Sequence, residues 1–222
     1  MMRKTSINGK CDREYRDEQG NVITFGSDCK IKECEIEIDG IGNNISFGSS
    51  LNAGIIHMYI HGDDHCISFG DNITVNGFLV IKAKQRDAVM NIGNRVVFQD
   101  TSLDSWGYNK IEIGDESSFG SRSFILAHSR SEIILGKDTM CACDAIIQTG
   151  DGHTIFSVET GKPINYDVDV VGSGECYSRI IICNHVWIGR RAFLLSGSGE
   201  TKIESGSIIG AESFVKGFFQ KM

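Results

Sequence analysis

Four blocks of six residues stand out between Ile182 and Val215: Ile182-Cys183-Asn184-His185-Val186-Trp187, Ile188-Gly189-Arg190-Arg191-Ala192-Phe193, Ile203-Glu204-Ser205-Gly206-Ser207-Ile208 and Ile209-Gly210-Ala211-Glu212-Ser213-Phe214. Each block opens with isoleucine, and its fifth position holds a small or apolar residue. This period is neither that of an amphipathic helix nor the alternation of a single strand. Repetition at a short fixed period indicates a solenoid, in which similar units stack along one axis.

The six-residue period has a direct physical interpretation. Three blocks make one turn of a solenoid with a triangular cross-section, and each block supplies one short strand and one corner. The first-position aliphatic side chain points inward and stacks on its counterpart one coil along, and the fifth position admits only a small group beside it. Glycine after the aliphatic residue allows a sharp corner. Stacked strands about 4.8 Å apart share hydrogen bonds along the axis, and several coils are needed to bury the apolar faces.

The same pattern recurs over much of the chain. It is clear at 41–52, 69–73, 92–96, 113–117 and 135–139. The repeat is longer than three blocks of six, because 21 positions separate Ile92 from Ile113 and 22 separate Ile113 from Leu135. We therefore predict that each coil carries a few extra residues at one corner, and that these residues line up along one edge.

One interval is much longer, since Ile182 follows Leu135 by 47 positions. The excess predicts an excursion loop at about 151–180, from near His153 to near Ile180, which contains the only proline of the chain. Long loops without a period of their own are commonly binding loops or lids. Residues 1–20 are polar, show no period and are expected to form a tail or an irregular cap. Residues 21–222 are predicted to form a single all-β solenoid domain.

Composition excludes several classes of function. The formal net charge of −7 argues against a nucleic-acid partner, which requires a basic surface. No apolar run approaches the roughly 20 residues of a membrane span, and no signal region follows the N-terminus, so we expect a cytoplasmic protein. The eight cysteines are expected to be reduced. Cys141 occupies a core position of its block and is interpreted as a small hydrophobe, and His61-Gly62-Asp63-Asp64-His65 as a solvated turn rather than a metal site.

Three segments together resemble a known family. They are Gly152–Phe156 with its Gly-His pair, Thr160–Asn165, and His185–Gly189 with its Val-Trp-Ile-Gly sequence. In this order they resemble the hexapeptide-repeat O-acetyltransferases, in particular those that acetylate capsule polysaccharides, including sialic acid polymers. The resemblance implies a left-handed parallel β-helix, a homotrimer, acetyl-CoA bound in a groove between subunits, and His153 as the general base.

The chemistry of this reaction agrees with those residue types. A sugar hydroxyl that attacks a thioester must lose its proton, and a neutral histidine with a pKa near 6.5 accepts it at neutral pH. The oxyanion that forms needs a fixed donor, and the resemblance assigns this role to the main-chain amide of Arg190. Asp151 either orients His153 or is simply solvated. His185 is expected to be a surface residue, and no metal is required.

The resemblance also implies a coenzyme site. Trp187 would lie along the pantetheine arm, and Gly189, Arg190, Ala211 and Lys216 match the other positions that contact coenzyme A in the family. Trp187 stands at the sixth position of its block, so its ring is predicted to point out of the solenoid. Relatives continue past the last block with a proline-containing turn and a short helix, which this sequence lacks, so we expect weaker contacts to the far end of the coenzyme.

Two other functions fit the repeat. A gamma-class carbonic anhydrase also has this solenoid, but its zinc needs three histidines on adjacent coils. His128 and His153 are 25 positions apart, close to one coil, and no third histidine is in register. The short C-terminal segment after Phe214 would also suit a non-catalytic solenoid.

Overall fold

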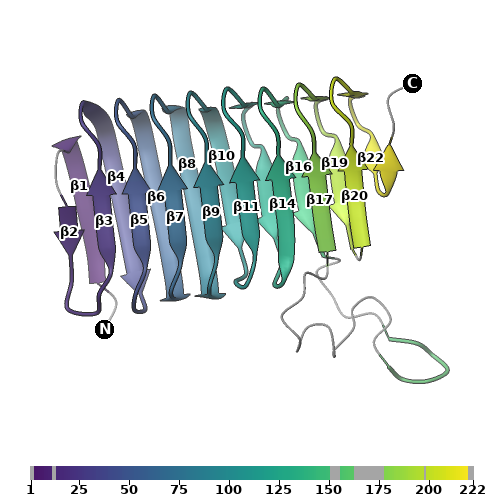
Figure 1. Ribbon diagram of the computed structural model, residues 1–222, viewed down its shortest axis with the longest axis horizontal. Coiled ribbons are helices and arrows are strands. Elements are labelled where there is room, and N and C mark those ends of the chain that lie inside the picture. The colour runs from purple at the N-terminus through teal and green to yellow at the C-terminus, as the bar shows by residue number, and fades with distance from the viewer. Residues whose placement is uncertain (1–2, 12–13, 151–155, 163–177, 198, 220–222) are drawn as a thin grey trace.

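The computed structural model describes residues 3–11, 14–150, 156–162, 178–197 and 199–219. The chain forms one elongated solenoid, with the first strands at one end and the last strands at the other (Figure 1). Every regular element within the described residues is a β-strand. This part of the chain therefore contains no helix that is long and apolar enough to cross a membrane. The predicted all-β, parallel β-helix solenoid is therefore confirmed.

Two sheets make up the walls of the solenoid. The 13-stranded sheet contains β1 (Arg3–Cys11), β4 (Cys29–Asp39), β6 (Asn52–Asp63), β8 (Thr74–Arg86), β10 (Val97–Ser105), β12 (Ser118–Phe119), β13 (Phe124–Ala127), β15 (Met140–Cys141), β16 (Ile146–Thr149), β18 (Trp187–Ile188), β19 (Phe193–Ser196), β21 (Ile208–Ile209) and β22 (Phe214–Val215). The 10-stranded sheet contains β2 (Glu14–Arg16), β3 (Val22–Phe25), β5 (Asn44–Phe47), β7 (Cys66–Phe69), β9 (Val89–Ile92), β11 (Lys110–Ile113), β14 (Ser131–Leu135), β17 (Ser178–Ile182), β20 (Gly199–Ile203) and β23 (Phe218–Phe219).

The cross-section changes along the axis. In the first half the larger sheet consists of single long strands, such as β6 with 12 residues and β8 with 13. From β12 onward a corner divides the same path into two short strands. At the first of these corners no side chain fits, because a Cβ on Gly120 would lie 2.7 Å from the amide nitrogen of Cys143 on the next coil. The first coils have no such corner within the larger sheet, where β6 and β8 run through without a break.

The first residues of the chain close the solenoid at its N-terminal end. Strand β1 pairs antiparallel with β4, and β2 pairs antiparallel with β3, whereas all other strand pairs in the described residues are parallel. A solenoid would otherwise end in a row of unpaired backbone groups, which invites association with other chains. The predicted polar segment 1–20 thus contributes antiparallel strands over the first coil.

The extra residues of each coil lie on one edge of the solenoid. At this edge the chain passes from a strand of the larger sheet to the next strand of the 10-stranded sheet. They form the turns after β8, β10 and β13, along the lower edge in Figure 1. The excursion leaves the same edge after Thr149 and returns at Ser178, slightly before the predicted limit. Ile180 instead pairs with Ile133 inside the sheet and is fully buried.

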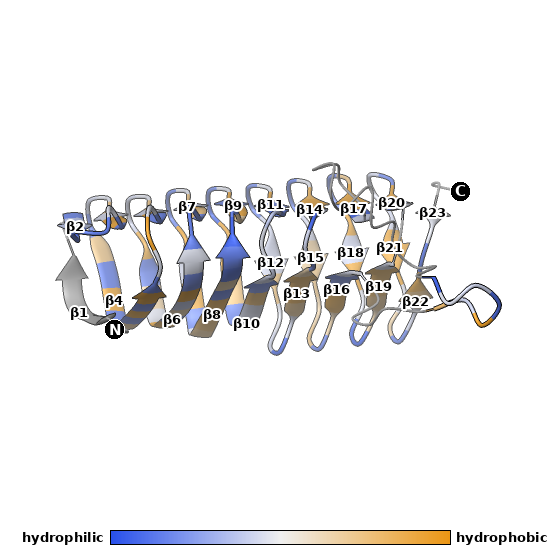
Figure 2. Ribbon diagram, turned by 90° about the horizontal axis from the view of Figure 1, so that it is seen from below, coloured by the Kyte–Doolittle hydropathy of each residue, from blue (hydrophilic) through white to orange (hydrophobic). Residues whose placement is uncertain are grey.

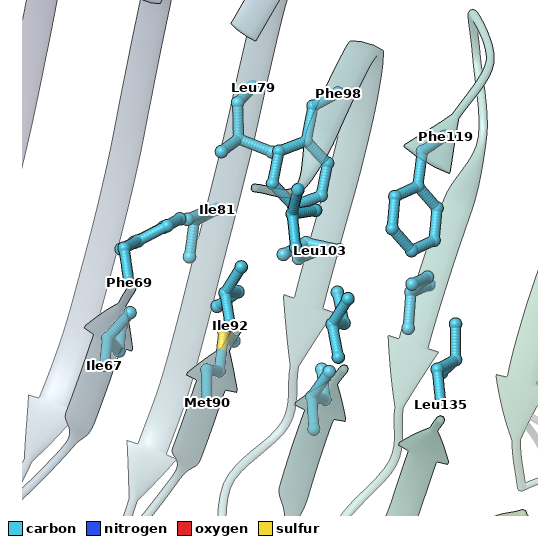
Figure 3. Close-up of a cluster of buried hydrophobic side chains, with 14 of the residues drawn as sticks. Ile67, Phe69, Leu79, Ile81, Met90, Ile92, Phe98, Leu103, Phe119 and Leu135 are labelled. Carbon is cyan, nitrogen blue, oxygen red and sulfur yellow. The ribbon is translucent and has the colours of Figure 1, made fainter. Parts of the chain in front are cut away.

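The core is a set of ladders in which like side chains stack from coil to coil. Phe98 and Phe119 are both buried, and their rings stack with centroids 5.2 Å apart (Figure 3). Cys141 lies in the core as predicted, and burial raises the pKa of its thiol to about 12, so the thiol stays protonated and packs as a hydrophobe.

A buried polar ladder lines the edge that carries the extra residues. The amide of Asn43 donates to the Asn21 side-chain oxygen at 2.9 Å, and the amide of His65 donates to the Asn43 side-chain oxygen at 3.0 Å. The amide of Ala88 then donates to Nδ1 of His65 at 3.1 Å. The interpretation of 61–65 as a solvated turn is therefore wrong, because His61 belongs to β6 and His65 is only 1% exposed. Sequence spacing could not reveal that His65 takes the place of an asparagine in this ladder.

Replacing His65 with asparagine is expected to remove part of the acid sensitivity of the fold. Burial lowers the pKa of His65 below 6.5, and its Nδ1 must be unprotonated to accept the bond from Ala88. The unfolded chain therefore binds the proton more readily, and the wild type loses this stability as pH falls below about 6.5. Asparagine keeps an acceptor and does not titrate. Unfolding free energies of both proteins between pH 8 and pH 5 should converge at high pH and diverge on acidification, and parallel curves would contradict the assignment.

Candidate functional site

The corner between β18 and β19 collects most of the predicted coenzyme residues. Trp187 is 48% exposed and points outward, as predicted, while the next residue, Ile188, is fully buried. The alternation follows from strand geometry, in which successive side chains point to opposite faces. An exposed indole beside a glycine corner offers a flat apolar surface to a ligand.

Gly189 brings two coils into close contact at this corner. A Cβ on Gly189 would lie 2.6 Å from the amide nitrogen of Ala211, so no larger residue fits without separating the coils. The amide of Glu212 donates to the Arg190 carbonyl at 2.8 Å, which places Arg190 and Ala211 on neighbouring coils of one corner. The Arg190 amide itself donates to no acceptor among the described residues.

Lys216 lies apart from that corner. It is exposed and follows β22, two residues beyond Phe214 on the same outward face. The structure therefore brings Trp187, Gly189, Arg190 and Ala211 together. Lys216 lies at the other end of β22 from Ala211.

A charged ladder, which the sequence analysis did not identify, crosses the same corner. The Arg122 guanidinium binds both carboxylate oxygens of Asp144, at 2.6 and 3.0 Å. Arg190 reaches the same carboxylate from the next coil, with Nε 3.5 Å from Oδ2. The hydrogen bonds from Arg122 lower the pKa of Asp144, so the carboxylate stays ionised between two arginines. This ladder of two arginines and one aspartate carries a net positive charge, which suits the phosphates of a coenzyme. The sequence signal that could have revealed this ladder is the spacing between Arg122 and Asp144, which equals one coil length.

Asp151 and His153 lie outside the described residues, so their predicted catalytic roles stay predictions. The structure places the chain on both sides of them. Gly150, with a φ of +74°, leaves the solenoid one coil before Trp187, and its amide donates to the Ser196 carbonyl at 2.7 Å. Within the excursion, Phe156–Lys162 forms a turn in which the Ser157 amide donates to the Lys162 carbonyl at 2.8 Å.

The other described histidines do not form a metal centre. No three His, Cys, Asp or Glu side chains converge on one point in the described parts of the chain. The His128 ring is tilted by 45° against the Trp106 ring, with centroids 4.6 Å apart. His185 is exposed, as predicted, and its Nδ1 lies 2.6 Å from the Asp138 carboxylate at the opposite end of β18 from Gly189.

Comparisons with known proteins agree with the predicted resemblance. No family model matches the chain. A polysialic acid O-acetyltransferase of Escherichia coli O1:K1 / APEC is 32% identical over 89 residues, which is 40% of this chain and 25% of that protein. A polysialic acid O-acetyltransferase of Neisseria meningitidis is 34% identical over 87 residues, 39% of this chain and 35% of that protein. The matched part is thus about a quarter to a third of each relative.

Two solved structures share the solenoid. The polysialic acid O-acetyltransferase OatWY superposes with a TM-score of 0.66 at 19% identity, covering 89% of this chain and 82% of that one. The polySia-specific acetyltransferase NeuO superposes with a TM-score of 0.52 at 19% identity, covering 88% and 78%. This chain has their fold. The resemblance to the polysialic acid O-acetyltransferases is confirmed by the sequence matches, and the superpositions show the shared fold.

Proposed function

We propose that this protein is an O-acetyltransferase, which moves an acetyl group from acetyl-CoA to a sugar hydroxyl of a capsule or other surface polysaccharide. The observation that carries the proposal is the corner formed by Trp187, Gly189 and Arg190 on the coil directly after the excursion that contains the Gly-His pair. The sequence matches to two polysialic acid O-acetyltransferases support it. Among the described residues no three potential metal ligands come together, so this part of the chain does not support the zinc alternative.

The proposed mechanism needs one base and one fixed donor. His153 removes the proton of the acceptor hydroxyl as oxygen attacks the thioester carbonyl, and the proton passes to the leaving thiolate when the tetrahedral intermediate collapses. The Arg190 amide, which has no acceptor among the described residues, donates to the oxyanion of that intermediate. Arg122 and Arg190 supply positive charge toward the phosphates of coenzyme A. No covalent intermediate on the enzyme is required.

The direct test incubates the purified protein with acetyl-CoA and polysialic acid. We expect thiol release that depends on the glycan, together with acetyl esters on the glycan detected by mass spectrometry. A panel of other capsule polysaccharides should follow, because the acceptor of this chain is part of the proposal. Acetyl-CoA turnover unchanged by every glycan would contradict the function, and stoichiometric zinc with hydratase activity would favour the alternative.

Replacing Trp187 with alanine is expected to weaken coenzyme A binding about three- to tenfold. The indole is half-exposed beside Gly189, and covering part of its apolar surface with the pantetheine arm contributes on the order of 1 kcal/mol at roughly 25 cal/mol per Å². Calorimetric titration with coenzyme A measures the change. Trp106→Ala is the matched control, since Trp106 lies on the turn after β10, three coils before Trp187, and should not alter coenzyme affinity. Equal affinities of the Trp187 variant and the wild type would refute this placement.

The proposal includes a homotrimer with active sites between subunits. Its support is the outer face of β13, β16, β19 and β22. These strands are hydrophobic along most of their length (Figure 2), and their buried residues alternate with partly or fully exposed ones. Phe124, Ile146, Phe193 and Phe214 are register partners there, and Phe214 is 62% exposed. Strands that are hydrophobic on both faces are normally covered on both. A second and third copy of the chain would cover this face.

Placing a charge on that face is expected to break the assembly. Phe193→Glu and Phe214→Glu introduce carboxylates whose burial between subunits would be strongly unfavourable. Sedimentation should find a trimer for the wild type and monomers for the double variant, while circular dichroism remains unchanged. Glu200→Gln, an exposed change on β20 of the other sheet, should leave the trimer intact. A fully active wild-type monomer would contradict this part of the proposal.

A further inference from the structure

Aromatic and basic side chains stack on the edge that carries the extra residues. Nζ of Lys84 lies 5.1 Å from the centroid of the Trp106 ring. The ring of His128, one coil further along, lies 4.6 Å from Trp106. Beyond His128 comes Gly150, where a Cβ would lie 2.8 Å from the His128 ring. The stack therefore follows the solenoid axis over three coils and ends against the residue at which the excursion begins.

A second pair lies on the same turns. The guanidinium carbon of Arg130 lies 5.0 Å from the centroid of the Tyr108 ring. These two side chains line a shallow depression of about 210 Å³, together with Asn109, Lys110 and Glu132, among others. The depression is smaller than the roughly 300–1,000 Å³ of a typical small-molecule pocket. Its size suits one sugar ring of a longer chain rather than a whole separate ligand.

We name Lys84, Trp106, Tyr108, His128 and Arg130 the stacked corner. Its two cations differ from their neighbours, because Lys84 and Arg130 lie on aromatic rings and form no ion pair with a carboxylate in the described parts of the chain. Nearby basic groups are neutralised, as Arg86 is by Asp64 at 2.6 Å and Lys110 is by Glu112 at 2.7 Å. The chain as a whole has a net charge of −7, but Lys84 and Arg130 contact aromatic rings rather than carboxylates. Their positive charges therefore attract an external anion locally.

The aromatic residues determine which kind of anion fits. Trp106 is 37% exposed and Tyr108 is 40% exposed, so the corner presents apolar ring surface beside charge. Pyranose rings carry apolar C–H faces that pack on aromatic surface, and a carboxylate on the same sugar pairs with lysine or arginine. A nucleic acid would need a much more basic surface. Carboxylated sugars match both features.

The corner is also held in place before any ligand arrives. The Ser129 hydroxyl donates to the Trp106 carbonyl at 2.8 Å, and the Asn109 side-chain amide donates to the Ala127 carbonyl at 2.7 Å. These bonds join successive turns of the edge. A rigid site loses less entropy on binding than a flexible loop does.

We infer that the stacked corner binds carboxylated sugar units of an acidic polysaccharide acceptor, on the coils that lead to the excursion at Gly150. The inference rests on the proposed function and adds to it the surface and the chemistry that select the acceptor. The side chains of the stack lie on successive coils, so they can contact several sugar units of one chain at once. The site thus favours a polymer over a single sugar.

The test measures glycan binding separately from acetyl transfer. Wild type and the double variant Lys84→Gln/Arg130→Gln are titrated onto immobilised polysialic acid and polygalacturonate without acetyl-CoA. Arg95→Gln is the matched control, because Arg95 is an exposed arginine paired with Glu116 on the opposite edge. We expect the double variant to bind about tenfold or more weakly, and the control to bind as the wild type does. Trp106→Leu should weaken binding as well, and thermal melts should establish that all variants are folded.

Soluble competitors then decide whether the site recognises sugar or merely charge. Polysialic acid should displace the bound protein far better than neutral dextran or poly-glutamate of similar length. Equal binding by wild type and double variant, or equal competition by poly-glutamate, would overturn the inference. In turnover assays the double variant should raise the KM for the polymer and leave coenzyme A affinity unchanged. Glycan binding without any acetyl transfer would count against the proposed function while supporting the stacked corner.

Discussion

Replacing His153 with alanine is expected to lower the acetyl-transfer turnover by about 10²–10⁴-fold. In the proposed mechanism the imidazole accepts the proton of the acceptor hydroxyl only as attack proceeds, so its loss should raise the barrier by about 3–5 kcal/mol and affect kcat rather than coenzyme affinity. His153 falls between the end of β16 at Thr149 and the start of β17 at Ser178, outside the strands that stack in the core, so we expect the melting temperature to change little. Steady-state kinetics with the true acceptor, together with calorimetry for coenzyme A, measure both effects.

Two further measurements make the test of His153 specific. The wild-type rate should rise with pH through a pKa between roughly 6 and 7, because the histidine must be neutral to act. His185→Ala is the control, since His185 is exposed and paired with Asp138 at 2.6 Å, and it should retain most of the activity. If the His153 variant turned over at the wild-type rate, the general-base assignment would fail. The reverse pattern, with only the His185 variant inactive, would transfer the role to the His185–Asp138 pair.

Replacing Phe98 with alanine is expected to destabilise the fold by about 3–5 kcal/mol. The ring is fully buried and stacks on Phe119 of the next coil, so alanine leaves a cavity that rigid neighbouring coils cannot close. The position also marks the place where the long strand β10 is followed by the divided strands β12 and β13. The damage should therefore extend to both halves of the solenoid.

Phe78→Ala is the matched control, because Phe78 lies one strand away on β8 and is 38% exposed. Denaturant unfolding should show a large fall in midpoint for the Phe98 variant and a small change for the control. Solenoids unfold by segments when the coupling between neighbouring coils is weakened, so a new intermediate in the Phe98 curve would agree with the expectation. Similar midpoints for the two variants would show that Phe98 is not a key contact between the coils.

Short-range features were predictable from the sequence. The blocks from Ile182 to Phe214 predicted a parallel solenoid, because a corner every six residues and an inward side chain at fixed positions are local requirements of the backbone. The same logic predicted that Cys141 is buried, that Trp187 points outward and that the extra residues lie on one edge. The family resemblance rested on local segments too, and the comparisons confirmed it.

Contacts between coils could not be predicted in this way. The Arg122–Asp144–Arg190 ladder and the Lys84–Trp106–His128 stack join residues about one coil apart. Coil length varies, because Cys66 pairs with Val89 at 23 positions and Val89 pairs with Lys110 at 21, so which side chains meet depends on the register of strands that are distant in sequence. His65 is buried for the same reason, since only the stacking on Asn43 and Ala88 places it in a polar ladder. Local pattern therefore determines which face of the wall a residue occupies, and the register between coils determines its neighbours.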